Sequence, residues 1–349
     1  MTTNVRRFPF LTQAVDQGRM PVALLSGFLG SGKTTLVNAL LRDPRLADTA
    51  VAVNEFGLIP IDRDLIDHGP DKTVVLANGC LCCNLAGDLE SAMMRLFTRR
   101  ADGVIPQFKR LIVEPSGLAD PAPIAQAILR NPTMARTMRL AAIVTSVDSQ
   151  FGLAQLANHP ETRKQAALAE RIVLTKPDLV DTEMSDALRA ALRTVNGFAP
   201  ILAAERGDID PTMLFPPDFL SPDTAPVGAV AARPLWLAEP VDPAHTARIA
   251  SVALTAEAPL DWQVFDAWLK PVRLGHADTL LRIKGIMNIA GVAGPVVIQG
   301  VHHVLNNPVV LDAWPSEDRR SRLVLIGDPD TMAHARQSWE AALPSLAAR

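Results

Sequence analysis

One segment of the sequence has the residue types and spacing of a phosphate-binding loop, Gly27-Phe-Leu-Gly-Ser-Gly32-Lys33-Thr34. It matches the pattern G-x-x-x-x-G-K-[ST] at every position and lies between an apolar run and a helical pattern. In such a loop backbone N–H groups surround the phosphates, the lysine reaches the β- and γ-phosphates, and the threonine hydroxyl binds Mg²⁺. The alternative, a glycine-rich turn that binds nothing, leaves these flanks unexplained. The predicted nucleotide-binding residues here are Gly27, Gly30, Ser31, Gly32, Lys33, Thr34 and Thr35.

An acidic residue, Glu114 in the segment LIVEPSG, ends a hydrophobic run further along the chain. A Walker B acid holds Mg²⁺ from this kind of position, directly or through water, although aspartate is the usual residue there. Gly117 follows closely and is predicted to offer its N–H to the γ-phosphate, as a switch glycine does. We therefore expect Thr34 and Glu114 to bind magnesium. The alternative is an ordinary acidic residue at the end of a strand.

A third motif, Thr175-Lys176-Pro177-Asp178, follows a later apolar strand and indicates selection of guanine. One carboxylate can accept hydrogen bonds from both N1–H and N2–H₂ of guanine, whereas N1 of adenine is an acceptor and would leave a buried charge unpaired. We expect Asp178 to select GTP over ATP and the stem of Lys176 to cover the base. Thr175 stands where asparagine is usual. The alternative is that Asp178 serves as a helix N-cap.

The only three cysteines of the chain, Cys80, Cys82 and Cys83, lie within four positions. An odd number in so short a segment is no disulfide framework, and the cluster indicates a set of thiolate metal ligands. Sulfur ligands suit Zn²⁺, and tetrahedral geometry also suits Co²⁺ or Cu⁺. No fourth ligand is evident nearby, and an open position suits metal transfer better than a structural role. The alternative is that the cysteines are small buried apolar residues.

The elements that must position these residues alternate between short apolar strands and helices over the first two hundred residues. This alternation predicts an α/β fold of the P-loop NTPase type with a mostly parallel sheet. A proline-rich stretch without periodicity follows, and mixed strand and helix patterns beyond it predict a smaller α+β domain. The expected organisation is an N-terminal arm (1–20), a GTPase domain (21–214), a linker (215–234) and a C-terminal domain (235–349).

Charge and hydropathy exclude several classes of protein. The formal net charge is only −3 at pH 7, with Lys and Arg spread along the chain, so neither nucleic acid nor an anionic membrane is an expected partner. No apolar run approaches the roughly 18 residues of a membrane span, and the first residues lack the apolar core of a signal peptide. The expected location is therefore the cytoplasm, and the sequence leaves the oligomeric state open.

Taken together, these motifs resemble the CobW-like metallochaperone GTPases, a family that includes the cobalamin-synthesis W protein and zinc-related relatives. The resemblance covers nearly the whole chain. It is carried by SGFLGSGKTTLVNALL, VNEFGLIPID, NGCLCCNLAGDL, LIVEPSGLADPAPI and RIVLTKPDLV, and in the second domain by PLDWQVFDAWL, LLRIKGI, PVVIQGVHHVL and WPSEDRRSRLVLIG. A Cys-x-Cys-Cys element combined with a P-loop is highly specific for this family.

The resemblance implies slow GTP hydrolysis coupled to delivery of a transition metal, zinc first and cobalt second, to a client metalloprotein. It implies that the three cysteines are the metal ligands and that the second domain meets the client. It also implies a nucleotide-responsive switch at Asn54, Glu55 and Gly57. We expect Lys33, Glu55 and Glu114 to act in hydrolysis, with GTP, GDP, Mg²⁺ and Zn²⁺ or Co²⁺ as ligands.

The chain departs from the family pattern at several positions. Leu58 replaces a common glutamate after NEFG, which removes one acidic candidate for the metal site. The histidine-rich stretch that many relatives carry between the domains is reduced to His245. Outside it only His302 and His303 are adjacent, and on a strand they would point to opposite faces. Two functions remain open: a chaperone that delivers metal, and a zinc-sensing regulator that docks to a partner without delivery. The guanine motif disfavours a third, a small-molecule kinase.

Overall fold

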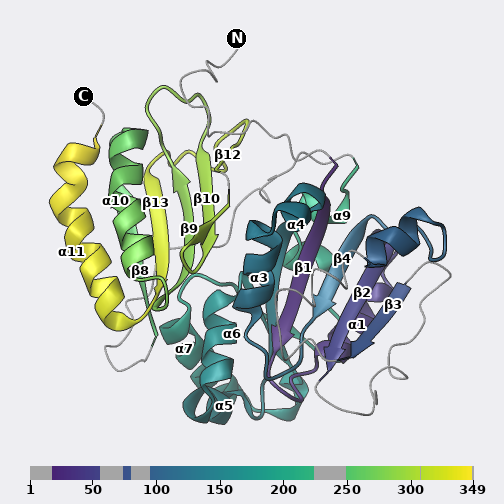
Figure 1. Cartoon of the computed structure of the whole chain (residues 1–349). Coiled ribbons are helices and arrows are strands. Elements are labelled where there is room, and N and C mark those ends of the chain that lie inside the picture. Colours follow the sequence, from purple (N-terminus) through teal and green to yellow (C-terminus); the bar gives the residue numbers. More distant parts are fainter. Residues whose placement is uncertain (1–17, 56–73, 80–94, 224–248, 307, 348–349) are drawn as a thin grey trace. The chain divides into compact units, whose positions relative to one another are not determined.

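The structure is a computed structural model, and it describes residues 18–55, 74–79, 95–223, 249–306 and 308–347. The chain divides into two compact units, each built around its own β-sheet (Figure 1). In the described part of the chain, no helix has both the length and the apolar character to cross a membrane.

The first domain contains a seven-stranded sheet in which every pair of neighbouring strands is parallel. The strand order is β3-β2-β4-β1-β5-β6-β7, so the strand that leads into the P-loop lies at the centre. The strands are β1 (Met20–Gly27), β2 (Thr49–Glu55), β3 (Val74–Gly79), β4 (Arg110–Glu114), β5 (Met138–Asp148), β6 (Arg171–Thr175) and β7 (Ile201–Ala204).

Helices cover both faces of this sheet, as the alternating pattern predicts (Figure 1). Helices α3 and α6 contact β1, and α1 and α9 contact the same strand. The named helices are α1 (Lys33–Leu41), η2 (Pro44–Leu46), α3 (Pro121–Arg130), α4 (Pro132–Thr137), α5 (Gly152–Asn158), α6 (Pro160–Leu168), η4 (Pro177–Leu179), α7 (Thr182–Val195), α8 (Pro211–Leu214) and α9 (Pro217–Leu220). Residues 95–101 are also helical.

The core beneath α1 explains why the central strand is mostly apolar. All eight residues of β1 are buried, because both faces of the strand lie under helices. On one face Ala23 and Leu25 pack with Leu36 of α1 in a single cluster. Phe215 and Phe219 belong to the same cluster, and their rings stack with centroids 4.5 Å apart.

The proline-rich segment predicted to be a linker therefore begins inside the first domain. Residues 217–220 form α9, and Arg139 of β5 holds this helix through a buried ion pair with Asp218, Nη1 to Oδ2 2.8 Å. Short proline-rich helices of this kind have no periodicity long enough to detect. Residues 224–234 of the predicted linker lie outside the described residues.

The second domain has a six-stranded antiparallel sheet with two helices, α10 (Trp262–Gly275) and α11 (Pro329–Leu346). Phe265 and Trp268 of α10 meet Trp339 of α11 in its core, with the two indole rings 4.9 Å apart. The strands are β8 (Ala250–Ala256), β9 (Leu280–Met287), β10 (Val296–Val301), β11 (Val304–Leu305), β12 (Val309–Val310) and β13 (Ser321–Gly327). An α/β domain followed by a smaller α+β domain is thus confirmed.

Candidate nucleotide-binding site

The P-loop joins the C-terminal end of β1 to the first turn of α1, as the motif predicts. Gly27, Gly30 and Gly32 all have positive φ angles, 147°, 72° and 80°, which side chains other than glycine rarely adopt. At Gly27 a Cβ atom would lie 2.4 Å from the Ser146 hydroxyl, so the space is closed as well. The loop requires glycine here for both reasons.

The side chains behind the loop hold its shape. Ser31 is fully buried, and its hydroxyl lies 2.8 Å from that of Ser146, which donates to the carbonyl of Ser26. The Thr175 hydroxyl donates to the Ser31 carbonyl at 2.9 Å. Strands β5 and β6 therefore brace the loop from beneath.

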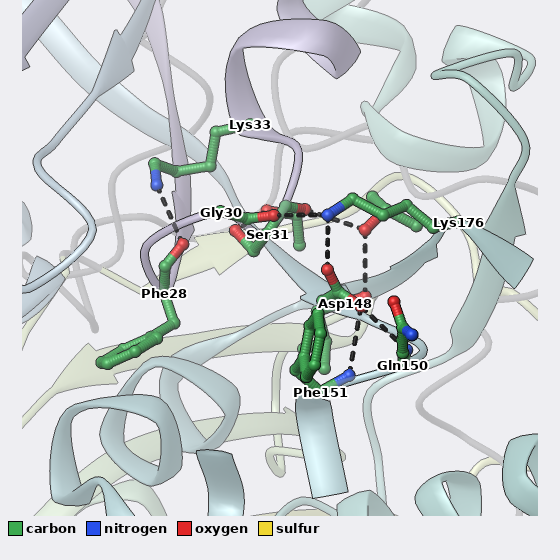
Figure 2. Close-up of polar contacts among 11 residues, drawn as sticks. Phe28, Gly30, Ser31, Lys33, Asp148, Gln150, Phe151 and Lys176 are labelled. Carbon is green, nitrogen blue, oxygen red and sulfur yellow. Dashed lines mark hydrogen bonds and ion pairs between the residues drawn. The ribbon is translucent and has the colours of Figure 1, made fainter. Parts of the chain in front are cut away.

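Lys33 lies across the loop with its amino group over the backbone (Figure 2). Its Nζ donates to the carbonyl oxygens of Gly27 and Phe28, both at 3.1 Å, and the side chain is buried. These carbonyls keep the ammonium group at the site where the motif places phosphate. Thr35, the last predicted residue of the segment, is exposed on α1.

Thr34 and Glu114, the predicted magnesium ligands, come together although they are far apart in sequence. The Thr34 hydroxyl donates to Glu114 Oε1 at 3.0 Å. Glu114 ends β4 next to β1 in the sheet and is only 4% exposed. A hydroxyl beside a buried carboxylate, at the N-terminus of α1, is a donor set that suits Mg²⁺.

Gly117 packs directly against the P-loop. A Cβ atom at this position would lie 2.6 Å from the backbone nitrogen of Leu29, so only glycine allows the approach. Gln165 of α6 donates both protons of its side-chain amide to this segment, to the carbonyls of Gly117 at 3.1 Å and Ala119 at 3.0 Å. The sequence alone gives no sign of this clamp, because it depends on how α6 packs.

The guanine motif follows β6 and is tied to the P-loop through Lys176. Its Nζ donates to the Gly30 carbonyl at 3.0 Å and pairs with Asp148 Oδ2 at 2.5 Å (Figure 2). Asp148, at the end of β5, is almost fully buried, and its Oδ1 accepts from the backbone nitrogens of Gln150 and Phe151. Sequence reasoning missed Asp148. Its position as an acid at the end of a long apolar strand, like that of Glu114 at the end of β4, was the available signal.

Asp178 is exposed just beyond β6, in the short helix η4. The alternative role, capping the next helix, belongs to Asp181, whose Oδ1 accepts from the Met184 nitrogen at 2.9 Å. Thr175, by contrast, gives its hydroxyl proton to the P-loop and to the Val147 carbonyl. A further residue absent from the sequence argument is His159, whose ring lies 4.5 Å from that of Phe28 in the P-loop.

The predicted transition-metal ligands Cys80, Cys82 and Cys83 lie outside the described residues, as do Gly57, Leu58 and His245. Within the described ranges no group of three or more His, Cys, Asp or Glu is placed to hold a metal. The backbone is informative, however. In the parallel sheet Glu55 of β2 pairs with Gly79 of β3, and Val53 pairs with Glu114. The cysteine segment therefore begins at the carboxyl ends of the strands, the same end of the sheet at which the P-loop lies.

Comparison with known proteins supports this description. The family model for the CobW/HypB/UreG nucleotide-binding domain matches residues 21–203, and that for the cobalamin synthesis protein cobW C-terminal domain matches residues 249–343. The zinc chaperone YjiA of Escherichia coli is 31% identical over 307 residues, covering 88% of this chain and 93% of the relative. The zinc chaperone CobW of a Sinorhizobium species is 27% identical over 90% of this chain and 95% of its own length.

A solved structure of similar architecture is a Zn(II)-bound triple mutant of the YjiA GTPase. It has a TM-score of 0.70 and 27% identity, covering 95% of this chain and 99% of that structure. The nucleotide-binding model matches more than half of the chain, and the C-terminal model matches most of the rest. The chain therefore belongs to the CobW family, with a CobW/HypB/UreG nucleotide-binding domain followed by a CobW C-terminal domain.

Proposed function

We propose that this protein is a GTP hydrolase that binds zinc at Cys80, Cys82 and Cys83 and delivers it to a client protein. The observation that carries the proposal is the order β3-β2-β4-β1 in one parallel sheet. In this order the start of the cysteine segment, the end of β2 and Glu114 all lie at the carboxyl ends of neighbouring strands, where the P-loop also lies. Neighbouring strands are about 4.8 Å apart, so β3 lies roughly 14 Å from β1.

The nucleotide would be held by this chain's own groups. Lys33 exchanges its two carbonyl acceptors, on Gly27 and Phe28, for the β- and γ-phosphates of GTP. The N–H groups at the N-terminus of α1 face the same phosphates. Asp178 accepts from the guanine edge, and Gly117 offers its N–H to the γ-phosphate.

Magnesium would be held by the Thr34 hydroxyl and by Glu114, directly or through water. When bound, Mg²⁺ neutralises charge on the β- and γ-phosphates during hydrolysis. Glu55, at the end of β2, is the residue we propose to respond to the γ-phosphate.

Zinc is the proposed cargo because three thiolates suit it and because several relatives of this chain are named zinc chaperones. Cobalt is the second candidate. The C-terminal domain is the proposed meeting point with the client. A relative named a zinc-regulated GTPase metalloprotein activator is 27% identical over about half of this chain, which agrees with a client that is itself a metalloprotein.

A zinc-transfer assay tests the proposal. The zinc-loaded full chain is mixed with an excess of a coloured zinc chelator and with Mg–GTP, Mg–GDP or a non-hydrolysable GTP analogue. We expect hydrolysis to accelerate transfer in the wild type and not in Lys33→Ala, which should lose hydrolysis and bind nucleotide more weakly. In a Cys80→Ser, Cys82→Ser, Cys83→Ser protein, zinc transfer should not depend on the nucleotide. If the rate of zinc transfer is the same with every nucleotide while zinc still binds, the protein is a sensor and not a carrier.

A further inference from the structure

Two histidines of the second domain face each other where α10 ends and α11 begins. The ring centroids of His276 and His334 are 5.1 Å apart, and the ring planes are inclined by 48°. His276 is the residue that caps the C-terminus of α10 and is partly buried, while His334 is exposed on α11. The function proposed above uses neither residue.

The backbone of His276 is fixed. Its carbonyl accepts from the backbone nitrogens of Leu280 at 2.8 Å and Thr279 at 3.2 Å, and from the Thr279 hydroxyl at 3.5 Å. His334 is carried by α11, whose N-terminus is capped by Asp328. Both rings are therefore mounted on ordered backbone.

A chain of two threonine hydroxyl groups leads to Nδ1 of the His276 ring. If the Thr279 hydroxyl donates to the His276 carbonyl, 3.5 Å away, it accepts from the hydroxyl of Thr331, 2.7 Å away. The Thr331 hydroxyl has then used its proton, so it accepts from His276 Nδ1, 3.4 Å away. This assignment places the proton on Nδ1 and leaves the lone pair of Nε2 available. Metal-binding histidines are oriented in the same way, by a hydrogen bond from the other ring nitrogen.

The separation of the rings suits one shared ion. Zinc lies about 2.0–2.1 Å from an imidazole nitrogen, and tetrahedral angles then place two ring centroids about 5 Å apart. Two imidazole rings that only pack against each other do not need an available nitrogen. Two rings that share an ion each need one nitrogen lone pair directed at it. His334 can supply its lone pair from either ring nitrogen.

We propose that His276 Nε2 and a ring nitrogen of His334 bind a zinc-class divalent cation in the C-terminal domain. Since no described group contains three metal-ligating side chains, water or a side chain of another protein completes the coordination. Two protein ligands at a partly exposed position make a weak, open site. Such a site suits an ion in transit rather than a structural ion.

Zinc titration of the full chain tests the proposal in a background that carries Cys80→Ser, Cys82→Ser and Cys83→Ser, which removes every cysteine. Histidine ¹H–¹⁵N spectra should show metal binding at two rings, with Nδ1 of His276 protonated. Competition with a zinc chelator should give one weakly bound ion. His334→Ala should abolish that binding, and Thr331→Val should weaken it about tenfold, the usual effect of removing such a supporting group.

His159→Ala is the matched control, because it removes another exposed histidine that lies in the first domain. It should leave zinc affinity unchanged. Thermal unfolding without metal shows whether each variant remains folded. Equal zinc affinity in the background and in folded His334→Ala would overturn the proposal, as would zinc-dependent shifts confined to His302 and His303. Neither result bears on the cysteine site, which this background lacks.

Discussion

Asp178 is a single exposed carboxylate, yet base selection is expected to depend on it. A carboxylate accepts from N1–H and N2–H₂ of guanine with one oxygen each, whereas an asparagine amide presents an NH₂ donor in place of the second oxygen. We predict that Asp178→Asn lowers GTP affinity by at least about 100-fold, since sites built to hydrogen-bond a ligand discriminate strongly. Competition binding with labelled GDP measures the change.

A matched ligand sharpens this test. Xanthosine triphosphate carries an oxygen where guanine carries N2–H₂, so the asparagine amide can donate to it. The Asp178→Asn variant should therefore bind xanthosine triphosphate better than the wild type does. If ATP competes as well as GTP for the unchanged protein, the assignment of Asp178 is wrong.

At the residue scale, the sequence was sufficient to locate the groups that depend on local pattern, while their roles stay predictions. The glycine spacing of the P-loop and the apolar run that ends at Glu114 are both present in the chain as written. Thr175 differs, because its hydroxyl turns toward the Ser31 carbonyl, a contact between residues 144 positions apart. The Asp148–Lys176 ion pair depends in the same way on β5 and β6 being neighbours. Contacts across strands are set by packing, which a single sequence does not display.

The helices and strands also divide into those that local sequence pattern predicts and those that it does not. Long buried strands and amphipathic helices were predictable from periodicity, whereas β7 has only four residues and was not anticipated. His302 and His303 were expected on a strand but form the turn between β10 and β11, where His302 takes a φ of 52°. The sequence argument that they point to opposite faces assumed a strand, and that premise is wrong.

Helix α6 carries the second prediction, through the amide of Gln165. Replacing Gln165 with Leu leaves the buried carbonyl of Gly117 and the partly buried carbonyl of Ala119 without these donors, and a lost partner costs about 1–3 kcal/mol where the carbonyl is buried. Because Gly117 is expected to meet only the γ-phosphate, affinity for a non-hydrolysable GTP analogue should fall more than affinity for GDP. Fluorescent nucleotide titrations measure both.

Thr145→Val is the matched control for Gln165→Leu. The Thr145 hydroxyl donates to the backbone carbonyl of Gln165, so this change also removes a buried hydrogen bond at the same residue. It leaves the amide clamp intact. We expect it to lower the free energy of unfolding by about 1 kcal/mol and to change the affinities for GDP and for the GTP analogue by the same factor. A similar loss of GDP and GTP-analogue affinity in Gln165→Leu would reduce Gln165 to a structural role.

Helix α9 carries the third prediction. Burial lowers the pKa of Arg139, and Asp218 opposes this by direct charge attraction and hydrogen bonding. Asp218→Asn therefore leaves a buried charge without its counter-ion, and we expect the first domain to lose about 3–5 kcal/mol of stability. The double variant Arg139→Met, Asp218→Leu should recover much of this loss, because it removes both charges.

The tryptophans allow this to be measured domain by domain. The four tryptophans that the structure describes, at positions 262, 268, 314 and 339, lie in the second domain, so tryptophan fluorescence in urea reports mainly that domain, while far-UV circular dichroism reports both. Asp218→Asn should move the circular dichroism transition and leave the fluorescence transition in place. Coincident shifts of both would mean that the two domains unfold as one unit.

At the scale of the whole molecule, the last prediction concerns coupling between nucleotide and metal. Glu55, the residue proposed to respond to the γ-phosphate, is paired in adjacent strands with Gly79, the last residue before the cysteine segment. A change at the γ-phosphate can therefore reach the cysteine segment through two strand ends. Linkage requires the effect to be reciprocal, and couplings of this kind are on the order of 1–3 kcal/mol.

The cysteine-dependent zinc affinity should accordingly differ by roughly 5- to 150-fold between the GDP form and the form with a non-hydrolysable GTP analogue. Chelator competition measures it in the wild type, and the triple Cys→Ser protein supplies the part to be subtracted. GTP-analogue affinity should shift by the same factor when zinc is added. Thiolates must lose protons to bind, so zinc affinity should also rise with pH through the cysteine range. Equal zinc affinity in both nucleotide forms would mean that the two sites are independent, and hydrolysis would then have no means of releasing the metal.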